Sequence, residues 1–415
     1  MNRDLLKARL GKLPQLPPIA TPDELDPNEE EELLDSFPTD HPPTASTSTA
    51  TKRRRGGSRQ DLSPLSGEGY FDQALQVDVP ISGLYTSSDV DTAFPATFRV
   101  YYTAPSTSNL GPDPDDGDDG TNSNGVVFVC VHGAGYSGLS FACVAKNLVE
   151  RGKGKVGVLS YDARGHGKTK LPPSGEEEDR EQASMELESM ADDLVSLLRT
   201  IYPSRDEAPG LVLVGHSMGG AVVAEACNRI QDSVADVLGV TVIDVVEGTA
   251  LEALSSMSNL IASQPKVFES KEAAIGWHLD SRTIKNVTSA RISVPPLIKP
   301  IASTATSEEE GAERYGWTVD LAKTEPYWKG WFTGLSAKFL GCRTAKLLIL
   351  AGTDRLDKEL LIGQMQGRYQ LEVFPEAGHC LHEDLPDRTA ETLLSFWERN
   401  DRTDVLKGVK KVGEL

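Results

Sequence analysis

Short apolar runs alternate with longer amphipathic stretches along much of the chain. Each run is rich in Val, Ile and Leu and is bounded by glycine or polar residues, which is typical of strands buried on both faces of a sheet. The segments that contain these predicted strands are 126–133, 155–167, 211–220, 240–248, 346–354 and 369–384. Between them, residues 184–202 repeat their apolar positions at helical spacing. This alternation predicts an α/β protein with a mainly parallel central sheet and helices on both faces.

The alternation stops between about residues 250 and 335, a region that is largely helical in its pattern and rich in tryptophan. We expect it to be a cap inserted over the carboxyl edge of the sheet. Trp328, Trp331 and Phe332 recur at helical spacing, which suits packing inside the cap. We also expect the cap to provide a docking surface for a partner, formed by its tryptophans and basic residues: Trp277, Trp317, Trp328, Trp331, Lys266, Lys271, Arg282 and Arg291.

The remaining segments are polar and rich in loop-forming residues. Residues 1–65 combine prolines with mixed charge and predict a disordered N-terminal arm, followed by one ordered domain at 66–400 and a tail at 401–415. We expect acidic surface insertions at about 106–124 and 172–182.

Composition narrows the classes of function. The chain has 415 residues with 42 basic and 62 acidic side chains, a formal charge of −20, which argues against a nucleic-acid partner. The basic run Lys52–Arg55 fits either a nuclear address or a solvated charge cluster. No apolar run approaches the roughly 18–20 residues of a membrane span, and no signal peptide is visible. Five scattered cysteines argue against a disulfide framework or a zinc site. We therefore expect an intracellular protein, cytoplasmic and/or nuclear, without a metal.

The segment LVLVGHSMGG contains a G-x-S-x-G motif directly after a predicted strand and before a predicted helix. This context makes Ser217 a candidate nucleophile on a sharp turn, where a Cβ at Gly215 or Gly219 would collide with a neighbouring element. The N–H of Met218 is then a candidate oxyanion donor at a helix N-terminus. The second donor is predicted to be the N–H of Ala134, in the loop HGAG after an earlier strand.

A serine nucleophile needs a base and an acid. His379 follows the last predicted strand and is the favoured base, with His382 as its nearest competitor. His166 is a candidate for supporting the site loop. Two aspartates follow predicted strands and suit the role of the acid, Asp244 in VIDVVEG and Asp354 in LLILAGTDR, and their spacing does not decide between them.

Several motifs together resemble the protein phosphatase methylesterases. They are GHSMGG, IDVVEGTALEAL, LAKTEPYWKGWFTGLS, LLILAGTDRLDKELLIGQMQG and GHCLHED, and the resemblance extends from about residue 60 to 397. It implies an α/β-hydrolase fold with a helical cap and a triad of Ser217, Asp244 and His379, which leaves Asp354 as the fallback acid. The usual H-G-G-G of the family is H-G-A-G here, and the two acidic insertions are longer than expected.

The resemblance also implies an activity and a partner. A serine carboxylesterase of this family removes the methyl ester from the C-terminal leucine of the protein phosphatase type 2A catalytic subunit, and it needs no cofactor. Two alternatives remain: a small-molecule carboxylesterase or thioesterase, and a regulator that binds the phosphatase without catalysis.

Overall fold

The computed structural model describes residues 61–81, 94–106, 125–172, 183–301, 313–352 and 356–401. The basic run Lys52–Arg55, Asp354, and most of the two acidic insertions and of the C-terminal tail lie outside the described residues.

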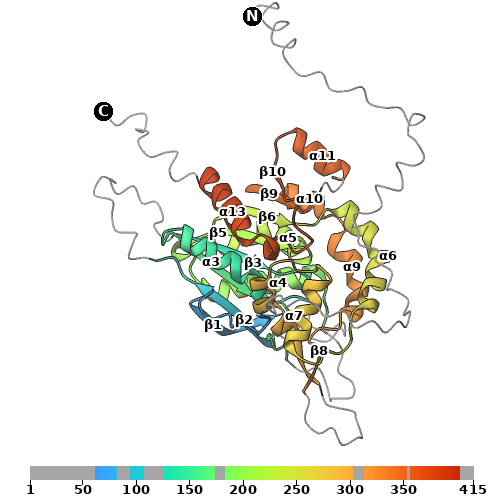
Figure 1. The fold of residues 1–415 in the computed structure, drawn as a ribbon. Coiled ribbons are helices and arrows are strands. Elements are labelled where there is room, and N and C mark those ends of the chain that lie inside the picture. Colours follow the sequence, from blue (N-terminus) through green and yellow to red (C-terminus); the bar gives the residue numbers. More distant parts are fainter. Residues whose placement is uncertain are drawn as a thin grey trace, which may run out of the picture. The chain divides into compact units, whose positions relative to one another are not determined.

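Within the described residues, eight strands form one sheet (Figure 1). Its order is β1-β2-β4-β3-β5-β6-β9-β10. The strands are β1 (Gln73–Ile81), β2 (Phe94–Thr103), β3 (Val126–Val131), β4 (Val156–Tyr161), β5 (Gly210–His216), β6 (Val237–Ile243), β9 (Ala345–Leu350) and β10 (Gln370–Val373). The strands from β4 to β10 are parallel, while β1 and β2 are antiparallel to their neighbours. The predicted mainly parallel sheet is confirmed.

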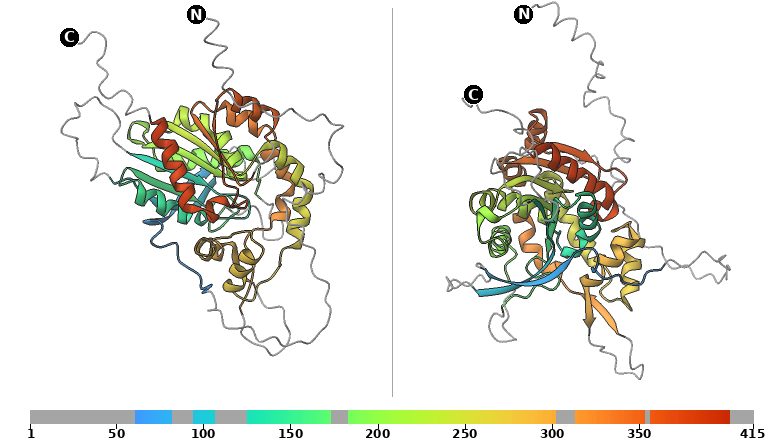
Figure 2. Two further views of the ribbon diagram at one scale, coloured as in Figure 1. Left: turned by 45° about the horizontal axis from the view of Figure 1, so that its top comes forward. Right: turned by 90° about the vertical axis from the view of Figure 1, so that its left-hand side faces the viewer.

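Helices cover both faces of this sheet (Figure 2). Residues 126, 128 and 130 of β3 pack with α3 (Ala142–Arg151) and α13 (Pro386–Asn400). Residues 127, 129 and 131 pack with α4 (Leu187–Ile201) and α5 (Met218–Ser233) on the other face. Because successive side chains of a strand point to opposite faces, a strand buried on both sides must be apolar throughout. This explains the continuous run VVFVCV.

The segment between β6 and β9 contains the predicted cap, is mainly helical, and is called the cap below. Its helices are α6 (Glu247–Ser263), α7 (Lys271–Asp280), α8 (Val287–Ser293), α9 (Glu325–Phe332) and α10 (Leu335–Gly341). It also contains a two-stranded antiparallel ribbon, β7 (Ile298–Ile301) with β8 (Arg314–Trp317), which the sequence pattern did not predict. The strands of this ribbon have four residues each, too few for a clear alternation.

The aromatic residues of α9 belong to the interior. Trp328, Trp331 and Phe332 are buried in the large core that also contains α4 and α5. The indole N–H of Trp331 donates to the carbonyl of Met185 (2.7 Å). The predicted packing of these three side chains is confirmed, and Trp328 and Trp331 cannot belong to the predicted docking surface because a partner cannot reach them.

Contacts with the cap extend to residues that precede the predicted boundary at residue 66. Arg291 of α8 donates to the carboxylate of Asp61 and to the carbonyl of Ser63. The N–H of Leu65 donates to the carbonyl of Arg291 (2.9 Å). Residues 61–65 thus lie against the cap, and Arg291 is engaged within the chain instead of being free for a partner. A polar segment held by such distant contacts carries no local periodic signal.

Candidate active site

Ser217 occupies a sharp turn between β5 and α5. Its backbone has φ +51° and ψ −119°, a conformation that a residue with a Cβ rarely adopts and that is often found at functional sites. A Cβ at Gly215 would overlap the carbonyl of Gly219 in α5, and a Cβ at Gly219 would overlap the carbonyl of Val131 in β3. The two flanking glycines are therefore required for the strand and the helix to approach so closely.

The loop after β3 lies beside this turn. A Cβ at Gly133 would come within 3.3 Å of the Cβ of Ser217. In the same loop, the N–H of Gly135 donates to Nε2 of His166 (2.9 Å), so His166 supports the loop as expected. Among the described residues, no hydrogen bond engages the N–H of Ala134 or that of Met218. Both groups belong to segments next to Ser217 and are free to donate to an oxyanion.

His379 and Asp244 are joined across the carboxyl edge of the sheet. Nδ1 of His379 lies 2.7 Å from Oδ2 of Asp244, whose Oδ1 accepts the N–H of Ala351 (2.7 Å). The Asp244 side chain is 9% exposed and that of His379 is 55% exposed. A largely buried carboxylate therefore holds one nitrogen of an imidazole that remains open to solvent. Asp354, the other candidate acid, lies outside the described residues.

His382 is buried away from solvent. Its ring stacks on Phe141 at 4.4 Å between centroids and lies 4.5 Å from the ring of His216. Burial lowers the pKa of His382 to about 3, so the ring is neutral at physiological pH. Among the described residues, neither of its nitrogens has a hydrogen-bond partner. The geometry thus places His379, and not His382, against the carboxylate of Asp244.

Two further buried histidines hold the loops around Ser217. Nε2 of His132 accepts the N–H of Ala163, and Nδ1 lies 2.8 Å from the carbonyl of Gly133. Burial lowers the pKa of His132 to about 3 and that of His166 to about 4. Each ring is therefore neutral, with Nδ1 donating to a backbone carbonyl, that of Gly133 for His132 and that of Arg164 for His166, and with Nε2 as the acceptor. No local pattern in the sequence indicates the role of His132, because its partner Ala163 follows a different strand.

Hydrogen bonds join the cap to the loop that carries the candidate base His379, residues 374–380, which is called the base loop below. Asp384 accepts the N–H of Gly378 with Oδ2 and the N–H of Lys285 with Oδ1, both at 2.7 Å. The hydroxyl of Ser289 in α8 donates to the carbonyl of Glu383 (2.8 Å). Sequence reasoning did not single out Asp384, although an acid five residues after a candidate base is a signal that could have drawn attention to it. These bonds fix the base loop relative to the cap.

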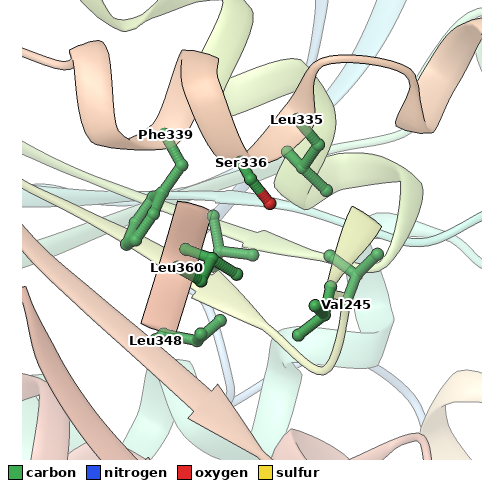
Figure 3. Close-up of a pocket in the computed structure, with 8 residues that line it drawn as sticks. Val245, Leu335, Ser336, Phe339, Leu348 and Leu360 are labelled. Atoms are coloured by element: carbon green, nitrogen blue, oxygen red, sulfur yellow. The ribbon is translucent and has the colours of Figure 1, made fainter. Parts of the chain in front are cut away.

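A small cavity lies between α10 and the carboxyl-terminal parts of β6 and β9 (Figure 3). Its volume is about 10 Å³, and its lining residues are Val242, Val245, Val246, Leu335, Ser336, Phe339, Leu348 and Leu360. This space accommodates one water at most. The cavity is therefore a packing defect between the sheet and the helices α10 and α11 (Lys358–Met365), and not a substrate site.

Among the described residues, no helix is long and apolar enough to cross a membrane. In the same part of the chain, no group of three or more His, Cys, Asp or Glu side chains is arranged to hold a metal ion. All five cysteines of the sequence are free thiols.

Comparison with known proteins gives consistent results. Residues 128–392 match the model of the alpha/beta hydrolase family. The chain is 41% identical to Protein phosphatase methylesterase 1 of Cryptococcus neoformans, over 96% of this chain and 93% of that protein. It is 47% identical to the protein of the same name from Gibberella zeae, over 67% of each chain.

Two solved structures show the same fold at low sequence identity. The peroxisomal alpha-beta-hydrolase Lpx1 of Saccharomyces cerevisiae has a TM-score of 0.57 at 16% identity and covers 83% of this chain and 91% of its own. E-2-(acetamidomethylene)succinate hydrolase has a TM-score of 0.54 at 20% identity, covering 79% of this chain and 100% of its own.

Proposed function

This chain belongs to the protein phosphatase methylesterase family of α/β-hydrolases, and we propose that it removes the methyl ester from the C-terminal leucine of the protein phosphatase type 2A catalytic subunit. As a member of this family it is an ester hydrolase. The observation that carries the proposed chemistry is the 2.7 Å contact between His379 and Asp244, on the same sheet edge as the strained turn at Ser217.

The proposed reaction is a two-step acyl transfer. His379 takes the proton of Ser217 as the hydroxyl oxygen attacks the ester carbonyl. The resulting oxyanion is stabilised by the N–H groups of Met218 and Ala134. His379 then gives its proton to the leaving methoxide, so methanol departs and an acyl-enzyme remains. A water molecule, activated by His379 in the same way, releases the leucine carboxylate and restores the Ser217 hydroxyl.

Asp244 has two roles in this scheme. It keeps the proton of the neutral imidazole on Nδ1, so that Nε2 is available to Ser217, and it stabilises the imidazolium that forms during each step. The bond from Ala351 and the low exposure of the carboxylate support an oriented, ionised acid that does not itself become protonated.

We also propose that the chain acts on the phosphatase inside the cell, in the cytoplasm, the nucleus or both. Free thiols at all five cysteines suit a reducing compartment. Docking of the phosphatase is assigned to the cap, which is bonded to the base loop through Asp384 and Lys285.

The test measures methanol release from carboxymethylated phosphatase catalytic subunit by the wild-type chain and by Ser217→Ala, Asp244→Asn and Asp354→Asn. We expect Ser217→Ala to be inactive and Asp244→Asn to lose about 10⁴-fold in kcat, because the amide favours the wrong imidazole tautomer. Asp354→Asn is the matched control and should retain most activity.

Three results would contradict parts of this proposal. Loss of activity in Asp354→Asn but not in Asp244→Asn would transfer the role of the acid to Asp354. Equal turnover of a simple methyl ester and of the methylated phosphatase would indicate a small-molecule esterase. Tight phosphatase binding without methanol release by the wild type would indicate a regulator that works without catalysis.

A further inference from the structure

His216, the residue directly before Ser217, is fully buried at the end of β5. Its ring lies between three aromatic neighbours: the centroid distances are 4.7 Å to His379, 4.5 Å to His382 and 6.0 Å to Tyr136. These neighbours come from the base loop, the short helix α12 (Leu381–Asp384) and the loop after β3. The side chain of His216 therefore lies where the segments of the candidate site meet.

The hydrogen bond of this ring defines its protonation. Nε2 of His216 lies 2.9 Å from the carbonyl oxygen of His379. Because a carbonyl only accepts, Nε2 must carry the proton. Nδ1 is buried and has no hydrogen-bond partner among the described residues. A Cβ at Gly133 would come within 2.8 Å of this nitrogen. The loop after β3, which carries the proposed oxyanion donor Ala134 and is called the oxyanion loop below, therefore packs directly against the unprotonated edge of the ring.

The surroundings keep the ring in this neutral form. Burial, together with the neighbouring histidines His382 and His379, holds the pKa of His216 well below its usual range. The ring is therefore a permanent Nε2–H donor in the physiological pH range. Its Nδ1 side contacts the oxyanion loop at Gly133, and its Nε2–H donates to the carbonyl of His379, the proposed base.

We propose that His216 is a positioning residue, whose Nε2–H fixes the backbone of His379 relative to the strand that carries Ser217. The contact with Asp244 holds only Nδ1 of an imidazole that is 55% exposed, and Asp384 attaches the base loop to the cap and not to β5. Holding the backbone of His379 to the strand that carries Ser217 therefore needs a second point of attachment. The bond to the carbonyl supplies this second point of attachment. Since β5 continues directly into Ser217, the bond ties the base to the nucleophile through a rigid element.

This inference rests on the proposed roles of Ser217 and His379, but not on the identity of the ester. A misplacement of about 1 Å at a reacting group costs about 10²-fold in rate. Loss of the Nε2–H donor should therefore lower kcat by about 10- to 100-fold. Substrate binding should change little, because His216 is buried beneath the site and does not reach the surface.

The test compares two substitutions of similar length and volume, His216→Gln and His216→Met. The amide nitrogen of glutamine stands at the same number of bonds from Cβ as Nε2 of histidine, whereas methionine has no donor. We expect His216→Gln to keep kcat within about threefold of the wild type. We expect His216→Met to lose about 10- to 100-fold in kcat with KM within about twofold. Both are assayed with methylated phosphatase and with p-nitrophenyl acetate, beside urea unfolding.

The comparison separates positioning from packing. A packing role predicts that methionine, which suits an apolar site better, is at least as active as glutamine; that result would overturn the proposal. His216→Asn provides a second variant, since its shorter amide does not reach the carbonyl of His379, and equal kcat for the Asn and Gln variants would also overturn it. If the wild type cleaves p-nitrophenyl acetate but not the methylated phosphatase, the proposed substrate fails while this test still proceeds on the simple ester.

Discussion

Glu383 provides a sharp test of how the core beneath the base loop is built. Its side chain is fully buried, and neither carboxyl oxygen has a hydrogen-bond partner among the described residues. Burial raises the pKa of Glu383 from its ordinary value of 4.5 to about 8; the neighbouring hydroxyl of Ser293 opposes this shift and Asp384 adds to it. The carboxyl is therefore neutral in the folded protein at pH 7, while in the unfolded chain it is ionised.

The sign and size of the effect follow from this difference. A raised folded-state pKa gives a contribution to stability that is fully present below pH 4.5 and is lost as the pH rises to about 8. The loss is about 1.4 kcal/mol per pH unit. Between pH 5.5 and 8 the wild type should therefore lose about 3 kcal/mol in free energy of unfolding through this group.

Glu383→Gln removes the titration and retains the shape of the neutral carboxyl. We expect the free energy of unfolding of the variant, minus that of the wild type, to rise by about 3 kcal/mol from pH 5.5 to pH 8. The measurement is urea unfolding followed by tryptophan fluorescence at several pH values. Glu391→Gln, at an exposed position of α13, is the control and should follow the wild type. Parallel stability curves for wild type and Glu383→Gln would refute the assignment of a neutral buried carboxyl.

Two pairs of substitutions test the packing around the site by urea unfolding. Gly219→Ala should lower the free energy of unfolding by about 3 kcal/mol or more and abolish hydrolysis, because the added Cβ overlaps the neighbouring strand. Gly330→Ala in α9, where nothing lies within 4 Å of the added Cβ, should raise it by about 0.5–1 kcal/mol. Equal effects of the two substitutions would refute the close approach at the turn. Asp193→Ala should lower the free energy of unfolding by about 3–5 kcal/mol, because it removes the carboxylate that pairs with the buried Arg164. Asp192→Ala, at the more exposed ion pair with Arg229, should lower it by about 1 kcal/mol or less. Similar costs for the two aspartates would contradict the difference in burial.

Local sequence was informative wherever one element carries its own signal. The buried strands β3, β4, β5, β6 and β9 have continuous apolar runs, and α4 has a helical repeat, so both could be located without the structure. The edge strand β1 was not identified, because most of its residues are exposed and no apolar run marks it. The ribbon β7–β8 was missed because its strands are short and lie within the cap.

In the candidate site, too, the residues that could be predicted are those marked by a local sequence pattern. The turn at Ser217 was visible because a strand, two flanking glycines and a helix stand next to one another in sequence, and His379 was visible from its position after the last strand. The choice between Asp244 and Asp354 was not decided by spacing, since both follow parallel strands and either could face the base. The motif resemblance favoured Asp244, and in the structure it is the Asp244 carboxylate that contacts His379.

Patterns in the sequence were enough to predict the class of fold, a candidate nucleophile with a candidate base later in the chain, and the glycines that the turn at Ser217 requires. These features depend on backbone sterics and on burial patterns within single elements. Only the packing of the elements showed that the carboxylate of Asp244 contacts His379, which nitrogen of His216 carries a proton, and how Asp384 joins the cap to the base loop. Each of these contacts joins residues that lie on different elements or loops, and side-chain hydrogen bonds between such groups depend on how the elements pack, which no local pattern records.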